Sequence, residues 1–167
     1  MSDVLAIDPG TERSAWVLFS GWGAEERGIE QNEVIVEHII PTYVQVAQIG
    51  TVEMVESYGL PVGREVFETC VWIGRFAATW DRLAEGEPCR MVGRKDIKMH
   101  HCNQLRKVND SVLRQVMIDR FGPGRQKAIG TKADQGPCYG LKRDLWQALA
   151  LATAVWDWEQ EERQPPE

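Results

Sequence analysis

The fold is decided by two neighbouring stretches, DVLAIDPGT at residues 3–11 and AWVLF at residues 15–19. The first is an apolar strand that ends in one acid, Asp8. Pro9 and Gly10 then turn the chain, so that a second strand returns beside the first. Asp8 is therefore expected at the rim of a central sheet, next to buried residues. Because burying an unpartnered carboxylate costs several kcal/mol, we expect a positive group there, and a divalent cation is the simplest candidate.

Size and composition predict one folded domain. The chain has 167 residues, of which 43% are hydrophobic and seven are Trp, enough for a sizeable core. We expect a single domain over residues 1–158 and a frayed acidic tail over residues 159–167. The sequence shows neither an apolar run of membrane-spanning length nor a signal-peptide pattern, so we expect a cytoplasmic location and no membrane partner. The four cysteines are widely spaced and are expected to be reduced thiols.

The charge of the chain is unevenly distributed. The net charge is −6, yet residues 90–132 hold eleven Lys and Arg against three Asp and Glu. This segment carries +8 and the remainder −14. Such asymmetry within one domain is typical of a surface that binds a polyanion such as nucleic acid. The alternative is an ordinary solvated basic face.

Hydrophobic periodicity predicts five strands, separated first by loops and then by helices. The strands are expected at residues 4–8, 15–20, 33–39, 51–55 and 89–92, with a loop at 21–31. Helices are expected at residues 42–49, 64–84, 95–102, 109–121 and 141–159, with a second loop at 126–137. Gly74, within one of these helices, is interpreted as a point of close packing on the sheet. This order predicts an α/β fold with a central five-stranded mixed sheet flanked by helices.

A second acid, Glu53, lies in the otherwise apolar strand TVEMV at residues 51–55. If this strand pairs with the first one, Glu53 and Asp8 approach each other, and they repel unless a cation lies between them. Glu56 competes for the same role. Glu56 lies three residues after Glu53, so the two side chains point to opposite faces as long as the chain stays extended. Glu53 is therefore preferred.

A third acid, Asp144, lies near the start of the last predicted helix, where it begins an amphipathic run and shares a face with Gln147 and Ala148. By itself it is explained as an acid favoured by the positive end of the helix dipole. With Asp8 and Glu53 it makes a hard-oxygen site suited to Mg²⁺ or Mn²⁺. Beside a segment of charge +8, the expected chemistry is phosphodiester hydrolysis with two ions. One ion would activate a water, and the other would stabilise the leaving oxygen.

These motifs resemble the RuvC-type Holliday junction resolvases of the RNase H-like superfamily, and most of all their small phage-encoded members. The resemblance is carried, in order, by IDPGT at 7–11, VE at 52–53, SYGLPVG at 57–63, Asp110 before IDRFG at 118–122, and GPCYG at 136–140 before Asp144 and ALA at 148–150. It implies an RNase H-like nuclease domain, a homodimer, and resolution of four-way DNA junctions by paired symmetric nicks with a divalent metal and no nucleotide cofactor. A phage-encoded member would act in the host cytoplasm.

The resemblance also assigns residues. Asp8, Glu53 and Asp144 match the family's catalytic, metal-binding acids. Gln147 stands where many members have a second aspartate, so only its uncharged oxygen is offered as a fourth ligand. Asn109 stands where a basic residue often precedes the position of Asp110.

Further residues are expected to contact DNA. Lys95 and Lys98 are placed near the scissile phosphate, and Tyr58 on an unpaired base at the crossover. The junction arms would be held through backbone phosphates by Arg94, Arg106, Lys107, Arg114, Lys127 and Lys132. The alternative for each is a solvated or packed side chain.

Other functions stay open from the sequence alone. Sugar kinases and actin share a similar opening Asp-x-Gly-Thr hairpin, but their fold duplicates this core and the present chain holds one copy. A non-catalytic junction-binding protein of the same fold is kept open by Gln147. A third reading is a nuclease that prefers forks, flaps or RNA–DNA hybrids.

Overall fold

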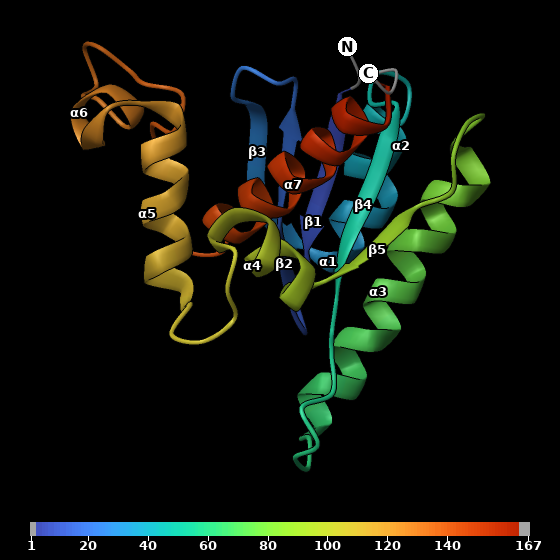
Figure 1. Cartoon of the computed structure of the whole chain (residues 1–167). Helices are drawn as coiled ribbons and strands as arrows, with labels where there is room; N and C mark the ends of the chain where they lie inside the picture. The colour runs from blue at the N-terminus through green and yellow to red at the C-terminus, as the bar shows by residue number, and fades with distance from the viewer. Residues whose placement is uncertain (1–2, 164–167) are drawn as a thin grey trace.

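The computed structural model describes residues 3–163, which fold around a five-stranded mixed sheet. The strands are β1 (Val4–Asp8), β2 (Arg13–Phe19), β3 (Ala24–Gln31), β4 (Ile49–Met54) and β5 (Arg90–Gly93). Their order across the sheet is β3-β2-β1-β4-β5 (Figure 1). β1 pairs antiparallel with β2 and parallel with β4, while β4 pairs parallel with β5. The predicted α/β fold with a central five-stranded mixed sheet is confirmed.

Helices cover both faces of the sheet (Figure 1). One layer contains α1 (Asn32–Val34), the π-helical segment η1 (Ile35–Ile39), α2 (Ile40–Tyr43) and α3 (Arg64–Leu83). The other contains α4 (Arg94–Cys102), α5 (Asp110–Phe121), α6 (Gly124–Ala128) and α7 (Leu145–Arg163). α7 packs directly on β1 and β2, and α5 packs on α7.

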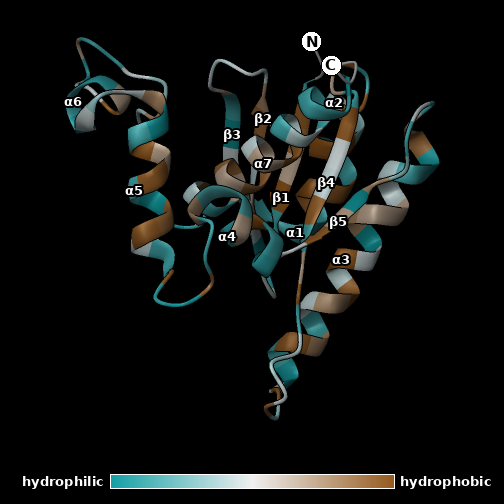
Figure 2. Ribbon diagram, in the orientation of Figure 1, coloured by the Kyte–Doolittle hydropathy of each residue, from teal (hydrophilic) through white to brown (hydrophobic). Residues whose placement is uncertain are grey.

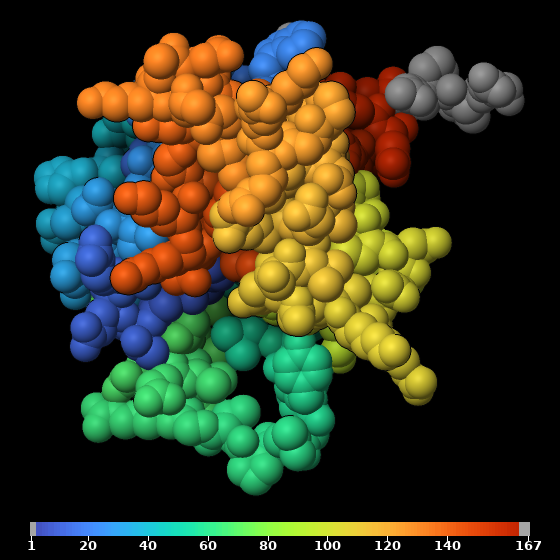
Figure 3. All heavy atoms as spheres, turned by 90° about the vertical axis from the view of Figure 1, so that its left-hand side faces the viewer, coloured from blue at the N-terminus to red at the C-terminus, as the bar shows by residue number. Residues whose placement is uncertain are grey.

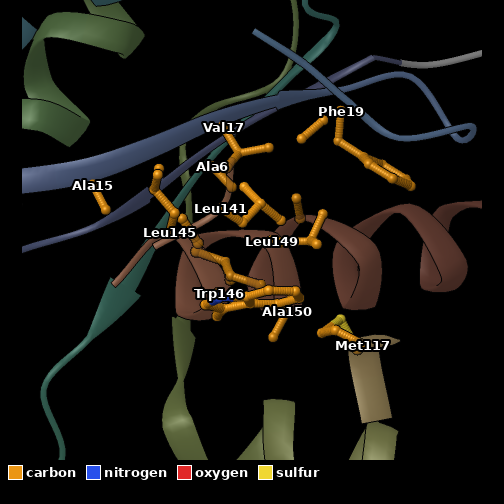
Figure 4. Close-up of a cluster of buried hydrophobic side chains, with 14 of the residues drawn as sticks. Ala6, Ala15, Val17, Phe19, Met117, Leu141, Leu145, Trp146, Leu149 and Ala150 are labelled. Carbon is orange, nitrogen blue, oxygen red and sulfur yellow. The ribbon is translucent and has the colours of Figure 1, made fainter. Parts of the chain in front are cut away.

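The helix α7 lies in the centre of one layer. Every residue from Leu145 to Val155 is buried. Figure 4 shows Leu145 and Leu149 beside Ala6 and Val17 of the sheet, with Met117 of α5 meeting α7 from the opposite side. A helix that is apolar on all sides is stable only when it is enclosed in this way.

The third strand and the segment after it differ from the prediction. The predicted loop at 21–31 contains β3, and the predicted strand at 33–39 is helical, as part of a continuous run that ends at Tyr43. The apparent alternation was misleading, because Ile35, Val36, Ile39 and Ile40 pack together on the α3-side core at helical spacing. β3 is a charged edge strand, typical of edges that avoid pairing with other chains, and its place is set by pairing with β2.

Several element boundaries also differ. The helix expected at 42–49 ends at Tyr43, and Ile49 already belongs to β4. The loop expected at 126–137 overlaps α6, which ends at Ala128. The last helix begins at Leu145 and continues to Arg163, so residues 159–163 of the predicted frayed tail are helical. Residues 164–167 of that tail lie outside the described residues.

Two predictions from composition concern the chain as a whole. All four cysteines are free thiols, as expected. Between residues 3 and 163, no helix combines the length and the apolar character needed to cross a membrane.

Gly50 in β4 is required by the packing of α3 on the sheet, because a Cβ there would lie 2.2 Å from the Trp80 indole. We expect Gly50→Ala to lower the free energy of unfolding by about 1–3 kcal/mol through overpacking. Urea denaturation measures it. Gly86→Ala is the control, because within the described structure no atom lies within 4 Å of a Cβ at that position. Equal losses in the two variants would contradict the packing argument.

Candidate active site

The parallel pairing of β1 with β4 brings the first two acids together. Ile7 is in register with Val52, so Asp8 and Glu53 follow side by side at the ends of neighbouring strands. Val4 and Ala6 belong to the core under α7, whereas Leu5 and Ile7 belong to the core under α3. Asp8 follows Val4 and Ala6 at alternate positions, so its side chain points to the α7 side. Ile49 of β4 belongs to the same core, and Glu53, four residues further on, points to the same side as Ile49. Both carboxylates therefore lie on the α7 side of the sheet.

Asp144 and Gln147 approach the same place from α7. The backbone carbonyl of Asp144 accepts the N–H groups of Gln147 and Ala148, each at 3.0 Å, so Asp144 is the residue that caps the helix. Its side chain is exposed, while that of Gln147 is buried. Both line a cavity of about 460 Å³, together with Asp110 and Arg114 of α5. Asp8 and Glu53 line a neighbouring cavity of about 260 Å³.

The electrostatics of this cluster are unfavourable for the carboxylates. Desolvation raises the pKa of Asp8 well above its usual range, and the charges of Glu53 and Asp144 raise that pKa further. Desolvation also raises the pKa of Glu53, although Arg94 opposes this effect. Glu53 is only 7% exposed. The site therefore gathers more negative charge than its surroundings neutralise.

Arg94, at the start of α4, lies among these groups. Its guanidinium donates to Glu53 Oε1 at 3.1 Å, to Gln147 Oε1 at 3.0 Å and to the Asp110 carboxylate. The sequence predicted a contact between Arg94 and DNA phosphate. The structure places this side chain between β4, α5 and α7, where it connects residues that line the two cavities.

The oxygen donors suit a hard divalent cation in their chemistry. Among residues 3–163, no three His, Cys, Asp or Glu side chains stand close enough together to hold an ion. The acids are instead grouped around Arg94. Burial and the charges of neighbouring acids both raise the pKa of Asp8, and a bound cation would offset both effects, so the donor set fits such an ion.

Glu56, the competitor of Glu53, has a separate position. Its Oε2 accepts the backbone N–H of Lys95 at 2.8 Å, so it caps the first turn of α4. A Cβ on Gly93 would lie 2.5 Å from Glu56 Oε1, and only glycine admits this approach. Glu56 thus fixes the backbone that carries Arg94.

The predicted DNA contacts divide into a near and a far group. Lys98 is near enough to Glu53 for its charge to lower the pKa of that carboxyl. The Lys95 ammonium lies 5.0 Å from the centre of the Tyr58 ring, and the Arg114 guanidinium lies 5.1 Å from the Trp146 ring. The exposed residues Arg106 and Lys107 occupy the connection between α4 and α5.

Lys127 and Lys132 form the far group. They follow the C-terminal end of α5, whereas Asp110 begins it. A helix of 12 residues is about 18 Å long. These two lysines therefore lie at the opposite end of α5 from the acids.

One residue that sequence reasoning missed is Asn32. It is fully buried, its Nδ2 donates to the Gly10 carbonyl at 2.9 Å, and its Oδ1 accepts the Ser14 hydroxyl proton at 2.6 Å. The Ser14 hydroxyl in turn accepts the Gly10 N–H at 3.0 Å. This network fixes the turn that follows Asp8. The available signal was a single Asn before an apolar run of helical period.

Asp110 was also missed as a member of the cluster. It appeared only as part of a sequence motif, yet its carboxylate accepts a hydrogen bond from Arg94. Asn109 caps α5 by accepting the Val112 N–H at 3.0 Å, which orients the first turn of the helix toward the site.

The fold can be compared with known proteins. No protein-family model matches the chain, and the search of curated proteins gives no significant match. Among solved structures, Thermus thermophilus RuvC in complex with Holliday junction substrate matches with a TM-score of 0.63 and 15% identity over 100% of both chains. A further Thermus thermophilus RuvC structure matches with a TM-score of 0.64 and 15% identity over 99% of both chains. The chain has the RuvC-type, RNase H-like fold.

The raised pKa of Asp8 gives stability a defined pH dependence. In the native state the Asp8 carboxyl stays protonated to a higher pH than it does in the unfolded chain. Ionised Asp8 therefore costs stability at neutral pH. The cost disappears as the pH falls toward the usual value of 3.8.

We therefore expect Asp8→Asn, in EDTA at neutral pH, to raise the free energy of unfolding by about 1–2 kcal/mol. This gain should shrink on acidification. Urea denaturation across a pH series measures both effects, with the exposed Glu85→Gln as control. An unchanged or lower stability of Asp8→Asn at neutral pH would mean that Asp8 is not under the repulsion described.

Proposed function

We propose that this protein is a structure-selective, divalent-metal-dependent endodeoxyribonuclease that resolves four-way DNA junctions by paired symmetric nicks. The observation that carries the proposal is the convergence of Asp8, Glu53 and Asp144 from the beginning, middle and end of the chain. It occurs within the RuvC-type fold, and one of the matched structures is a RuvC bound to a Holliday junction. A carboxylate cluster beside a basic segment is suited to phosphodiester hydrolysis.

In this proposal Asp8, Glu53 and Asp144 hold two Mg²⁺ or Mn²⁺ ions, and Gln147 adds its carboxamide oxygen. Bound divalent cations supply polarisation of the phosphate and a lowered pKa for the attacking water. Lys98, which lies near Glu53, is positioned to neutralise the scissile phosphate. The buried network around Asn32 keeps the turn after Asp8 rigid, which preserves the orientation of that carboxylate.

The proposed DNA surface runs along α4 and the start of α5. Figure 3 shows this face, with α5 and the α4–α5 connection (orange and yellow) at its centre and the segment 55–63 with the start of α3 (teal to green) projecting below. Arg106, Lys107 and Arg114 are exposed there and would contact backbone phosphates. Tyr58, 61% exposed on the projecting segment, would stack on an unpaired base. Lys127 and Lys132 would reach only DNA that extends past α5.

Paired nicks require two active sites, and α3 offers a surface for a second copy of the chain. Phe67 and Val71 are 63% and 62% exposed, and Gly74 and Ala78 continue the same helix face. Figure 2 shows apolar turns on α3 where it projects beyond the sheet. Gly74 does not pack on the sheet as the sequence suggested, because within the described structure nothing lies within 4 Å of a Cβ there. A small residue at this point allows a second helix to approach closely.

A second candidate is a junction-binding protein of the same fold that does not cut. Gln147 in place of an acid and the ion pairs of Arg94 within the carboxylate cluster favour it. A cleavage assay separates this candidate from the proposed nuclease.

We expect Asp8→Asn, Glu53→Gln and Asp144→Asn each to lower junction cleavage by about 100-fold or more, because each removes a proposed ligand. Binding to the uncut junction should be retained. Gel assays with Mg²⁺ on a four-way junction, a fork, a linear duplex and an RNA–DNA hybrid measure activity and selectivity, with Glu85→Gln as control. Normal cleavage by all three variants would refute the proposal. Junction binding without cleavage by the wild-type protein would favour the second candidate.

We expect Val71→Asp to convert the dimer into a monomer, because a charge on each copy would be buried at the α3 contact. Sedimentation velocity or light scattering measures the mass. Val46→Asp is the matched control, since Val46 is 48% exposed in the connection between α2 and β4 and does not belong to the proposed α3 surface. A wild-type monomer, or a Val71→Asp protein that stays dimeric, would rule out this interface.

A further inference from the structure

One cationic side chain lies where the proposed function requires a divalent cation to bind. Arg94 forms ion pairs with Glu53 of β4 and Asp110 of α5, and it donates a third bond to Gln147 of α7. Its side chain is 26% exposed, so the guanidinium is largely enclosed by these partners. Asp8 receives none of these three bonds. The four linked residues, Arg94, Glu53, Asp110 and Gln147, come from α4, β4, α5 and α7.

The guanidinium uses ligand oxygens. Glu53 Oε1 and Gln147 Oε1, at 3.1 and 3.0 Å from Arg94, belong to two of the side chains that would hold the metal in the proposed site. A guanidinium and a divalent cation within a few ångströms of one another repel strongly in a partly buried site. Arg94 and the cation therefore compete for the same oxygens.

The surroundings allow the side chain of Arg94 to move while its backbone stays in place. Glu56 caps α4 by accepting the Lys95 N–H at 2.8 Å, which anchors the backbone directly after Arg94. Cavities of about 260 Å³ and about 460 Å³ adjoin the site on the β4 and the α5 sides. A rotamer change would release Glu53 and Gln147 without any shift of the helix.

We infer that Arg94 is a displaceable internal cation: it neutralises the carboxylate cluster in the metal-free protein and must turn away before a divalent cation binds. The inference rests on the proposed function, because it requires the acids to be a metal site. It explains why no ready group of metal-binding side chains is found between residues 3 and 163. After displacement the guanidinium is available to a DNA phosphate.

The test compares Mn²⁺ binding by isothermal titration calorimetry in the absence of DNA. Arg94→Gln should bind Mn²⁺ about tenfold more tightly than the wild type, because a repelling charge is removed. Arg94→Lys keeps a positive charge and should stay close to the wild type. Arg82→Gln is the matched control, since Arg82 is exposed at the far end of α3 and the substitution changes the net charge equally.

Thermal denaturation gives a second readout that does not depend on activity. In EDTA, Arg94→Gln should melt below the wild type, because its carboxylates have lost their counter-ion. Saturating Mn²⁺ should raise its melting temperature by more than it raises that of the wild type. A folded far-UV circular dichroism spectrum of Arg94→Gln at low temperature establishes that the comparison is valid.

The outcomes separate the inference from the proposed function. If the wild type cuts junctions with Mg²⁺ while Arg94→Gln binds Mn²⁺ no more tightly than the wild type, the inference fails and the nuclease proposal survives. If neither protein binds Mn²⁺ and the wild type does not cut, both fail. Tighter binding by Arg94→Gln and by Arg82→Gln alike would indicate a general charge effect and would also overturn the inference.

Discussion

The parallel pairing of β1 with β4 is the constraint on which the candidate site depends. It fixes Asp8 beside Glu53 on one face of the sheet, where Glu53 is buried and Asp8 is partly buried. Desolvation raises the pKa of Asp8, and the repulsion between the two neighbouring acids raises that pKa further. The sheet can keep this arrangement because the surrounding core, with α7 enclosed in its centre, is extensive enough to offset the cost.

Two kinds of positive charge can offset the repulsion between these acids. One is internal: Arg94, whose backbone is anchored by Glu56, bonds to Glu53, Asp110 and Gln147. The other is a divalent cation, for which the oxygen donors are chemically suited. Arg94 leaves Asp8 without a hydrogen bond of its own, so its compensation of the cluster is incomplete. In the proposed function, a bound divalent cation would complete this compensation.

The sequence predicted four strands of the sheet but not the edge strand β3. β1, β2 and β4 have strong apolar patterns, because each is covered by helices and must bury its side chains, whereas the short strand β5 buries only Val92. β3 has a charged sequence, and its strand conformation comes from hydrogen bonding to β2, which no local pattern reveals. The segment after it contains both a short alternation and a helical period. Packing of Ile35 and Ile40 on α3 decides in favour of the helix.

What the sequence alone determined was the set of acids and the order of the elements that carry them. An acid that interrupts a strand otherwise apolar is visible without a structure, and so is an acid that begins a buried helix. The tertiary structure alone decided which polar groups share that space. Arg94, Asp110 and Asn32 are separated from Asp8 by 86, 102 and 24 positions, and their local sequence does not show that they contact this site or its turn. The meeting of β4, α4, α5 and α7 brings Arg94 to Glu53, Asp110 and Gln147, and the packing of α1 brings Asn32 to the turn after Asp8.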